Sequence, residues 1–80
     1  MKVFNVMLEG EADEKTGFFV TIEVAGRSKK EAGKLAIIEC SNTETENLKI
    51  EKIEIKTEDS HIKSAQIVKV YGKSYFPLTE

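Results

Sequence analysis

Residues that carry chemistry are scarce in this chain of 80 residues, which has one cysteine, Cys40, and one histidine, His61. A single cysteine excludes an internal disulfide. A structural zinc site needs about four cysteine, histidine or carboxylate ligands, and this pair falls short of that set. Catalysis by a Cys–His pair also needs an orienting group, and the residues around Cys40 match no nucleophile motif. We therefore expect no enzyme activity, no cofactor and no metal, with Cys40 buried at a helix end and His61 in a turn.

An excess of one charge sign and a long apolar run are also missing. The chain has 12 Lys and Arg against 14 Asp and Glu, a formal net charge of -2, whereas nucleic-acid-binding domains are usually strongly basic. No stretch approaches the roughly 20 apolar residues that span a bilayer. The short apolar run near the N-terminus is broken by Asn5 and Glu9 and lacks a cleavage site. We expect a cytoplasmic protein that does not contact membranes.

What the chain does contain predicts a single domain over residues 1–80. Two strands are expected in its first third, over residues 2–9 and 18–24, because apolar side chains recur there at every second position. An acidic, glycine-flanked loop over residues 10–17 would join them as a hairpin. The apolar side chains that would form one face are Phe4, Val6, Leu8, Phe18, Val20, Ile22 and Val24.

A helix start follows the second strand. Ser28 is placed to cap the first turn, and Glu31, three residues later, completes a capping box. The helix should run to Glu39 or Cys40 and bury Leu35, Ala36 and Ile38. The small side chains of Ala32 and Ala36 would let it lie close to a sheet.

The second half of the chain returns to strand periodicity. An exposed loop over residues 41–47 precedes a strand over residues 48–57, in which the apolar phase slips at Glu51–Lys52. A β-bulge would restore the facing of the side chains, and two short elements with a break are the alternative. A strand over residues 65–71 follows, and then a segment over residues 74–78. Pro77 cannot donate to a ladder, so this segment is an edge strand or coil.

This order predicts an α+β fold with two layers: a mostly antiparallel four-stranded sheet with one helix on one face, in the order β-β-α-β-β, with a possible short fifth strand. The uncovered face would carry Met7, Phe19, Thr21 and Glu23, together with several Lys and Glu residues. An apolar patch on that face would indicate a partner or a dimer.

Two groups of residues are candidate binding sites. The first joins the acidic loop to the aromatic segment near the C-terminus, as a surface for a protein partner: Glu11, Asp13, Glu14, Tyr75 and Phe76. The loop lacks the ligand spacing of a calcium-binding EF-hand, so we interpret its carboxylates as solvated. The second group surrounds the helix start, where backbone N–H groups favour anions: Arg27, Lys29, Lys30 and Lys34.

Parts of the chain resemble a family pattern. Residues 17–25 with residues 28–36, and the ending over residues 70–77, are similar to small bacterial and phage proteins that have a strand, a short helix start and a late Gly-aromatic-Pro segment. Some of these are toxin-immunity proteins and others are anti-CRISPR proteins. This chain departs from the usual Glu-Ala pair of that pattern, because Val24 precedes Ala25. The matching positions are those that make the fold, so the resemblance assigns no functional residue.

The absent chemistry, the small size and this resemblance favour a non-enzymatic protein that acts by occluding a protein partner, as inhibitors and immunity proteins do. A small nucleic-acid-binding module is the first alternative, using the basic residues at the helix start with an aromatic surface. A structural homodimer is the second, formed through Tyr75–Phe76 or through an exposed sheet edge.

Overall fold

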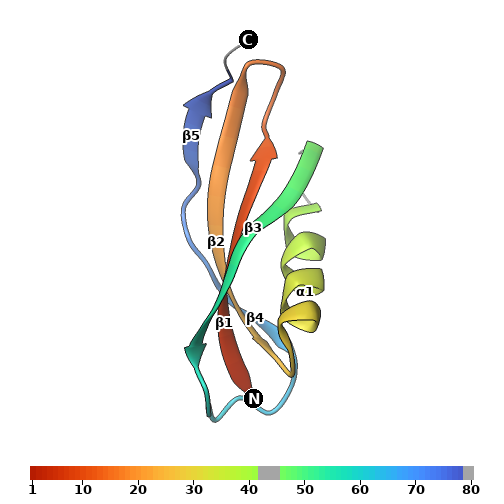
Figure 1. The fold of residues 1–80 in the computed structure, drawn as a ribbon, viewed down its shortest axis with the longest axis vertical. Coiled ribbons are helices and arrows are strands. Elements are labelled where there is room, and N and C mark those ends of the chain that lie inside the picture. Colours follow the sequence, from red (N-terminus) through yellow and green to blue (C-terminus); the bar gives the residue numbers. More distant parts are fainter. Residues whose placement is uncertain (42–45, 79–80) are drawn as a thin grey trace.

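A computed structural model describes residues 1–41 and 46–78. Within them the chain forms one antiparallel sheet with a single helix on one face (Figure 1). The elements are β1 (Lys2–Glu11), β2 (Thr16–Gly26), α1 (Lys29–Ser41), β3 (Glu46–Thr57), β4 (Gln66–Val70) and β5 (Ser74–Pro77). The sheet order is β3-β1-β2-β4, and β5 also pairs with β2. This is the α+β fold that the sequence predicts, with the short fifth strand present at an edge.

The β1–β2 hairpin forms the centre of the sheet. The molecule is 43 Å long and 19 Å across. Its pairing runs without a register shift from Lys2–Gly26 to Glu11–Gly17. The turn closes with an Ala12 N–H bond to the Thr16 carbonyl (2.8 Å). The prediction of a loop over residues 10–17 is therefore wrong in its bounds, because Gly10 and Gly17 lie within the strands.

The core lies between α1 and the facing side of the sheet, and every apolar position predicted for that side of β1 and β2 is buried. From α1 come the small side chains of Ala32, Ala36 and Cys40, and also Gly33. The prediction that Ile38 is buried is wrong, since its side chain is 60% exposed. Because the small residues mark the face that touches the sheet, Ile38 lies on the opposite side of the helix, and Leu35 at its flank is half-buried.

The predicted capping box opens α1. The Ser28 hydroxyl accepts a hydrogen bond from the Glu31 N–H (3.2 Å), and the Glu31 carboxylate accepts one from the Arg27 N–H (2.8 Å). The carboxylate thus reaches one residue further back than the usual N-cap N–H. The helix ends at Ser41, close to the predicted end. Residues 42–45 of the predicted 41–47 loop lie outside the described residues.

The phase slip in β3 is a β-bulge, as predicted. Lys52 pairs with Met7 and Ile50 pairs with Leu8, so Glu51 is the extra residue. The bulge keeps Ile50 and Ile53 on the helix-covered face, opposite Leu8 and Val6. It also leaves the charged side chains of β3 on the other face. The strand therefore has one apolar and one charged face in spite of the slip.

Candidate functional site

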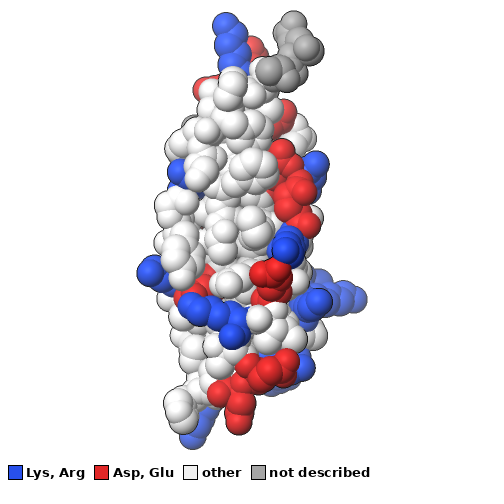
Figure 2. All heavy atoms as spheres, turned by 60° about the vertical axis from the view of Figure 1, so that its left-hand side comes forward, with Lys and Arg blue, Asp and Glu red and all other residues white. Residues whose placement is uncertain are grey.

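The sheet face that α1 leaves uncovered is the candidate site, and we call it the open face. It carries the partly exposed Met7, Phe19 and Tyr71. Phe76 reaches it from β5, where it pairs with Gly17, and its ring packs on Phe19 with a centroid separation of 4.8 Å. Figure 2 shows a broad uncharged surface in the upper half of the view, with Lys, Asp and Glu along one border and across the lower half. The face opposite the helix therefore carries a group of apolar side chains, formed by Met7, Phe19, Tyr71 and Phe76.

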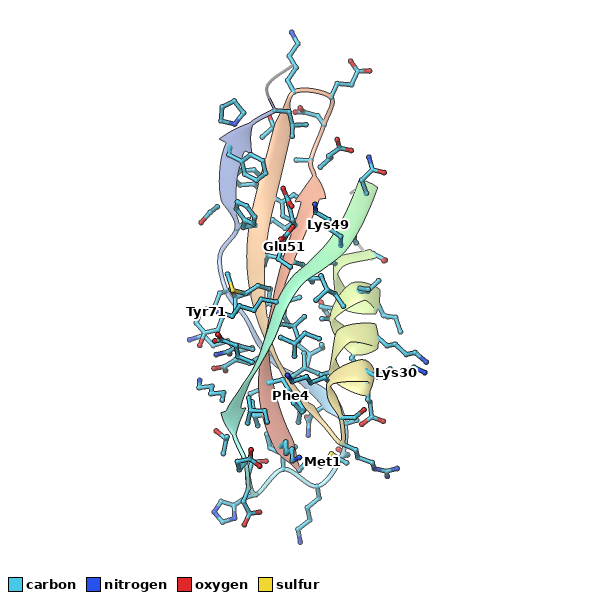
Figure 3. The ribbon with its side chains drawn as sticks, viewed as in Figure 1. Met1, Phe4, Lys30, Lys49, Glu51 and Tyr71 are labelled. Atoms are coloured by element: carbon cyan, nitrogen blue, oxygen red, sulfur yellow. The ribbon has the colours of Figure 1, made fainter. Side chains whose placement is uncertain are left out.

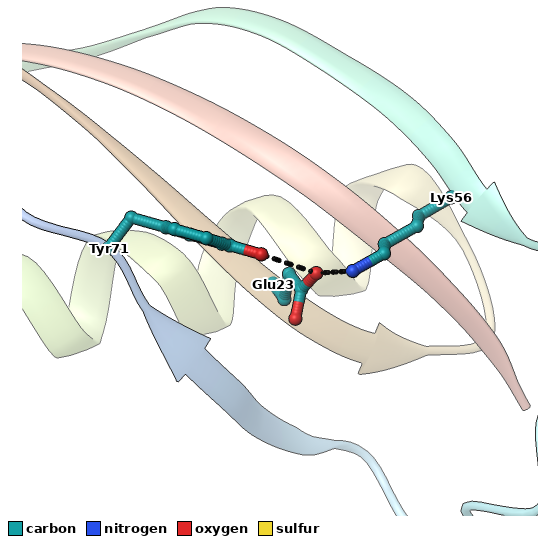
Figure 4. A network of polar contacts seen from close by, with 3 residues as sticks. All are labelled: Glu23, Lys56 and Tyr71. Atoms are coloured by element: carbon teal, nitrogen blue, oxygen red, sulfur yellow. Dashed lines mark hydrogen bonds and ion pairs between the residues drawn. The ribbon is translucent and has the colours of Figure 1, made fainter.

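A polar network lies within this face. Glu23 of β2 is only 5% exposed. Its Oε1 accepts a hydrogen bond from the Tyr71 hydroxyl (2.9 Å) and forms an ion pair with the Lys56 ammonium (Figure 4). A buried carboxylate needs such partners because desolvation of an unpaired charge is costly. The network joins β3, β2 and the segment after β4, so it holds the side chains of Tyr71 and Lys56 against Glu23.

The acidic turn and the aromatic segment meet at one end of the molecule. The Leu78 N–H donates to the Lys15 carbonyl (2.8 Å), which ties the residue after β5 to the turn. Asp13 accepts a hydrogen bond from the Lys15 N–H and so shapes the turn. Glu11 accepts a hydrogen bond from the Asn47 side chain, and Glu14 is exposed. The structure thus places the turn at the end of β5 through Lys15, whereas Glu11 on β1 contacts β3, on the other side of the hairpin.

Within β5, successive side chains point to opposite faces. Tyr75 pairs with Phe18 on the helix side of the sheet and is 62% exposed, whereas Phe76 lies on the open face. Only one of the two predicted aromatic residues therefore belongs to the open face. Tyr71 lies on the open face as well, and sequence reasoning missed its bond to Glu23. The usable signal was Glu23 itself, because a charged side chain on a strand paired on both sides needs a partner.

The basic residues at the helix start lie on the other side of the molecule. Figure 3 shows Lys30 beyond the helix and Tyr71 beyond the opposite side of the sheet. Arg27, Lys29 and Lys34 are exposed as well. Lys30 and Lys34 share a shallow hollow with Glu31, whose carboxylate opposes an anion there. These basic residues and the aromatic side chains of the open face therefore do not form one nucleic-acid surface.

Cys40 and His61 do not converge. The Cys40 thiol is buried near the C-terminal end of α1, and burial raises its pKa against the opposing effect of Lys73. A raised pKa disfavours the thiolate that a nucleophile requires. His61 follows Ser60, which bonds to Met1 at the other end of the sheet (Figure 1).

The described part of the chain contains no group of three potential metal-ligating side chains, and none of its helices is long and apolar enough to cross a bilayer.

Comparison with known proteins gives no match, so the candidate site is argued from its geometry. No family model matches the chain, and no match was found among the curated proteins or the solved structures. The resemblance to immunity and anti-CRISPR proteins therefore remains an expectation from sequence.

Proposed function

We propose that this is a non-enzymatic cytoplasmic binding protein that occludes a protein partner through its open face, as inhibitors and immunity proteins do. The observation that carries the proposal is the composition of that face. Aromatic residues and methionine are enriched at the centres of protein interfaces, and charged residues are depleted there. Met7, Phe19 and Tyr71 supply such a centre, and they are all partly exposed.

The border of the open face suits a protein partner as well. Lys49, Lys52 and Glu54 of β3 are exposed along it, with both charge signs interspersed. A polar rim of this kind surrounds the apolar centre in typical interfaces. The ladder between β1 and β2 is unbroken, and the Glu23 network fixes the middle of the face. Such a rigid surface loses little conformational entropy on binding.

The test compares the open face with a matched apolar site on the helix. The double variant Met7→Glu, Phe19→Glu places charge on the open face, while Ile38→Glu places the same charge on an exposed isoleucine of α1. Each chain is immobilised and exposed to a lysate of the cells that express it. We expect the wild type and Ile38→Glu to retain one protein in stoichiometric amount, and the double variant to lose it. Circular dichroism checks that all three chains are folded.

The retained protein is then purified and its own activity is measured with increasing amounts of the chain. We expect the wild type to block that activity at a one-to-one ratio and the double variant to leave it unchanged. Recovery of no stoichiometric protein, or equal retention by the open-face variant, contradicts the proposal. A complex that forms without loss of the partner's activity contradicts occlusion specifically.

A further inference from the structure

β3 forms one edge of the sheet, and its edge is long. In the described residues β3 pairs only with β1, so the backbone groups along its other side have no strand partner. The strand has 12 residues, against five in β4 at the opposite edge. Exposed edges invite pairing with another chain, and charged side chains along an edge normally prevent it, so a strand that pairs there has to match those charges. The charges of β3 therefore determine which strand can pair with it.

The sequence of β3 is complementary to itself when it is read in the opposite direction. In an antiparallel pair of two copies, with the two-fold axis between Glu51 and Lys52, oppositely charged and apolar residues meet. The opposed pairs are Lys49 with Glu54, Glu51 with Lys52, Ile50 with Ile53, and Leu48 with Ile55. A shift of one residue sets Ile50 against a charge, and a shift of two sets lysine against lysine. One register alone therefore satisfies residues 48–55.

The bulge makes this register consistent with the faces of the sheet. Lys49 and Lys52 pair with Glu9 and Met7 on the open face, and Glu51 contacts Lys49 there (3.3 Å). Ile50 and Ile53 lie on the helix side, where both would touch a side chain placed at Gly33. Because the two-fold axis is perpendicular to the sheet, the open faces of both copies lie on one side of the joined sheet and the helix-covered faces lie on the other. Charges would thus meet charges on the open face, and isoleucines would meet isoleucines beneath the helices.

The apolar side of this edge is incompletely covered by its own helix. Ile50 and Ile55 are both exposed by more than a third of their surface. In the two-fold arrangement they would meet Ile53 and Leu48 of the second copy, which removes apolar surface from water. The β4 edge offers no such match, because Gln66–Val70 contains a single charge, Lys69. The complementary charges and the uncovered isoleucines both lie on β3, and both favour pairing of this edge with a second β3.

We propose that the occupant is a second copy of this chain, joined through β3 in an antiparallel two-fold dimer. The dimer has one continuous sheet with both helices on one side and both open faces on the other. It does not depend on the proposed function, because it is argued from the charge order and the exposed isoleucines of β3 and not from the aromatic centre of the open face; the two surfaces share only the charged side chains of β3 at the border. The paired stretch covers only residues 48–55, so we expect a weak dimer with a dissociation constant on the order of 10 µM.

The test uses charge reversal along the edge. An acidic-edge variant carries Lys49→Glu and Lys52→Glu, and a basic-edge variant carries Glu51→Lys and Glu54→Lys, so that each opposes like charges across the axis. Sedimentation equilibrium is measured for each chain alone and for an equal mixture. We expect the wild type to dimerise, each variant to dimerise at least tenfold more weakly, and the mixture to form a one-to-one heterodimer.

A control variant separates pairing from net charge. Lys29→Glu with Lys34→Glu gives the same net charge as the acidic-edge variant but changes only exposed residues of α1. We expect it to dimerise as the wild type does and to form a heterodimer with the basic-edge variant more weakly than the acidic-edge variant does, because two of the four charge pairs then oppose like charges. A wild type that stays monomeric at about 100 µM, tenfold above the expected dissociation constant, overturns the proposal. So do variants that dimerise unchanged, or a mixture that forms no heterodimer.

Discussion

At the scale of single residues, Gly10 is required for space rather than for backbone conformation. No described glycine has a positive φ. A Cβ at Gly10 would lie 2.7 Å from Cζ of Phe18 and 2.8 Å from Cδ2 of Leu48, and the Phe18 ring is fully buried. Because the ring has no room to move, we expect Gly10→Ala to lower the free energy of unfolding by about 1–3 kcal/mol, the usual cost of overpacking. Urea denaturation measures the change.

The matched control is Gly72→Ala. A Cβ at Gly72 meets nothing within 4 Å, so we expect the free energy of unfolding to stay within about 0.5 kcal/mol of the wild type. Equal losses in the two variants would show that the chain needs glycine at Gly10 for a reason other than the Phe18 ring.

At the scale of elements, β3 is tied to β1 by charges on the open face. The Lys49 ammonium lies 3.3 Å from a carboxylate oxygen of Glu9 and 3.3 Å from one of Glu51. These two carboxylates raise the pKa of Lys49. The contacts of Glu51 with Glu9 and with Lys49 lower the pKa of Glu51. The contribution of Lys49 is therefore complete below its ordinary pKa of about 10.4 and is lost as the pH rises through the higher folded value.

The contribution of Glu51 to stability depends on pH in the opposite direction. Its contribution is present above the ordinary glutamate pKa of about 4.3 and is lost as the pH falls through the lower folded value. We expect Glu51→Gln to be less stable than the wild type at pH 6, and the difference in urea midpoint to vanish as the pH is lowered past that folded value. The measurement uses protein well below the expected dimer dissociation constant. A difference in midpoint that does not change with pH would exclude an ionic role for Glu51.

Elements are also where sequence reasoning succeeded most. Alternation fixes the buried faces of β1 and β2, the Ser28–Glu31 pair marks the start of α1, and the phase slip locates the bulge at Glu51. Each of these signals is local. The burial of Ile38 was predicted wrongly because helical spacing alone does not say which face meets the sheet. That choice depends on close approach at Gly33, where a side chain would contact Ile50 of a distant strand.

At the scale of the whole molecule, the open face was predicted in part. Met7, Phe19 and Glu23 follow from strand alternation, but Tyr71 does not, because it lies after β4, outside any strand. Its N–H bonds to the Thr21 carbonyl (3.0 Å), and this contact brings its side chain over the open face to Glu23. Sequence patterns do not encode such a long-range placement. The part of the candidate site that spans several elements therefore became visible only in the structure.

The Glu23 network links distant parts of the chain, and a double-mutant cycle tests that link. Tyr71→Phe removes the hydroxyl that donates to Glu23, and Lys56→Met removes the cation while keeping the aliphatic stem. We expect each change to lower the free energy of unfolding by about 1–2 kcal/mol, since each leaves a buried carboxylate with one partner fewer. Because both groups contact the same oxygen, the double variant should depart from additivity by about 0.5 kcal/mol or more. Tyr75→Phe, at a side chain that is 62% exposed, is the control and should change nothing measurable. Strict additivity, or a Tyr71→Phe variant as stable as the wild type, would mean that β3 and the segment after β4 are held in place independently of Glu23.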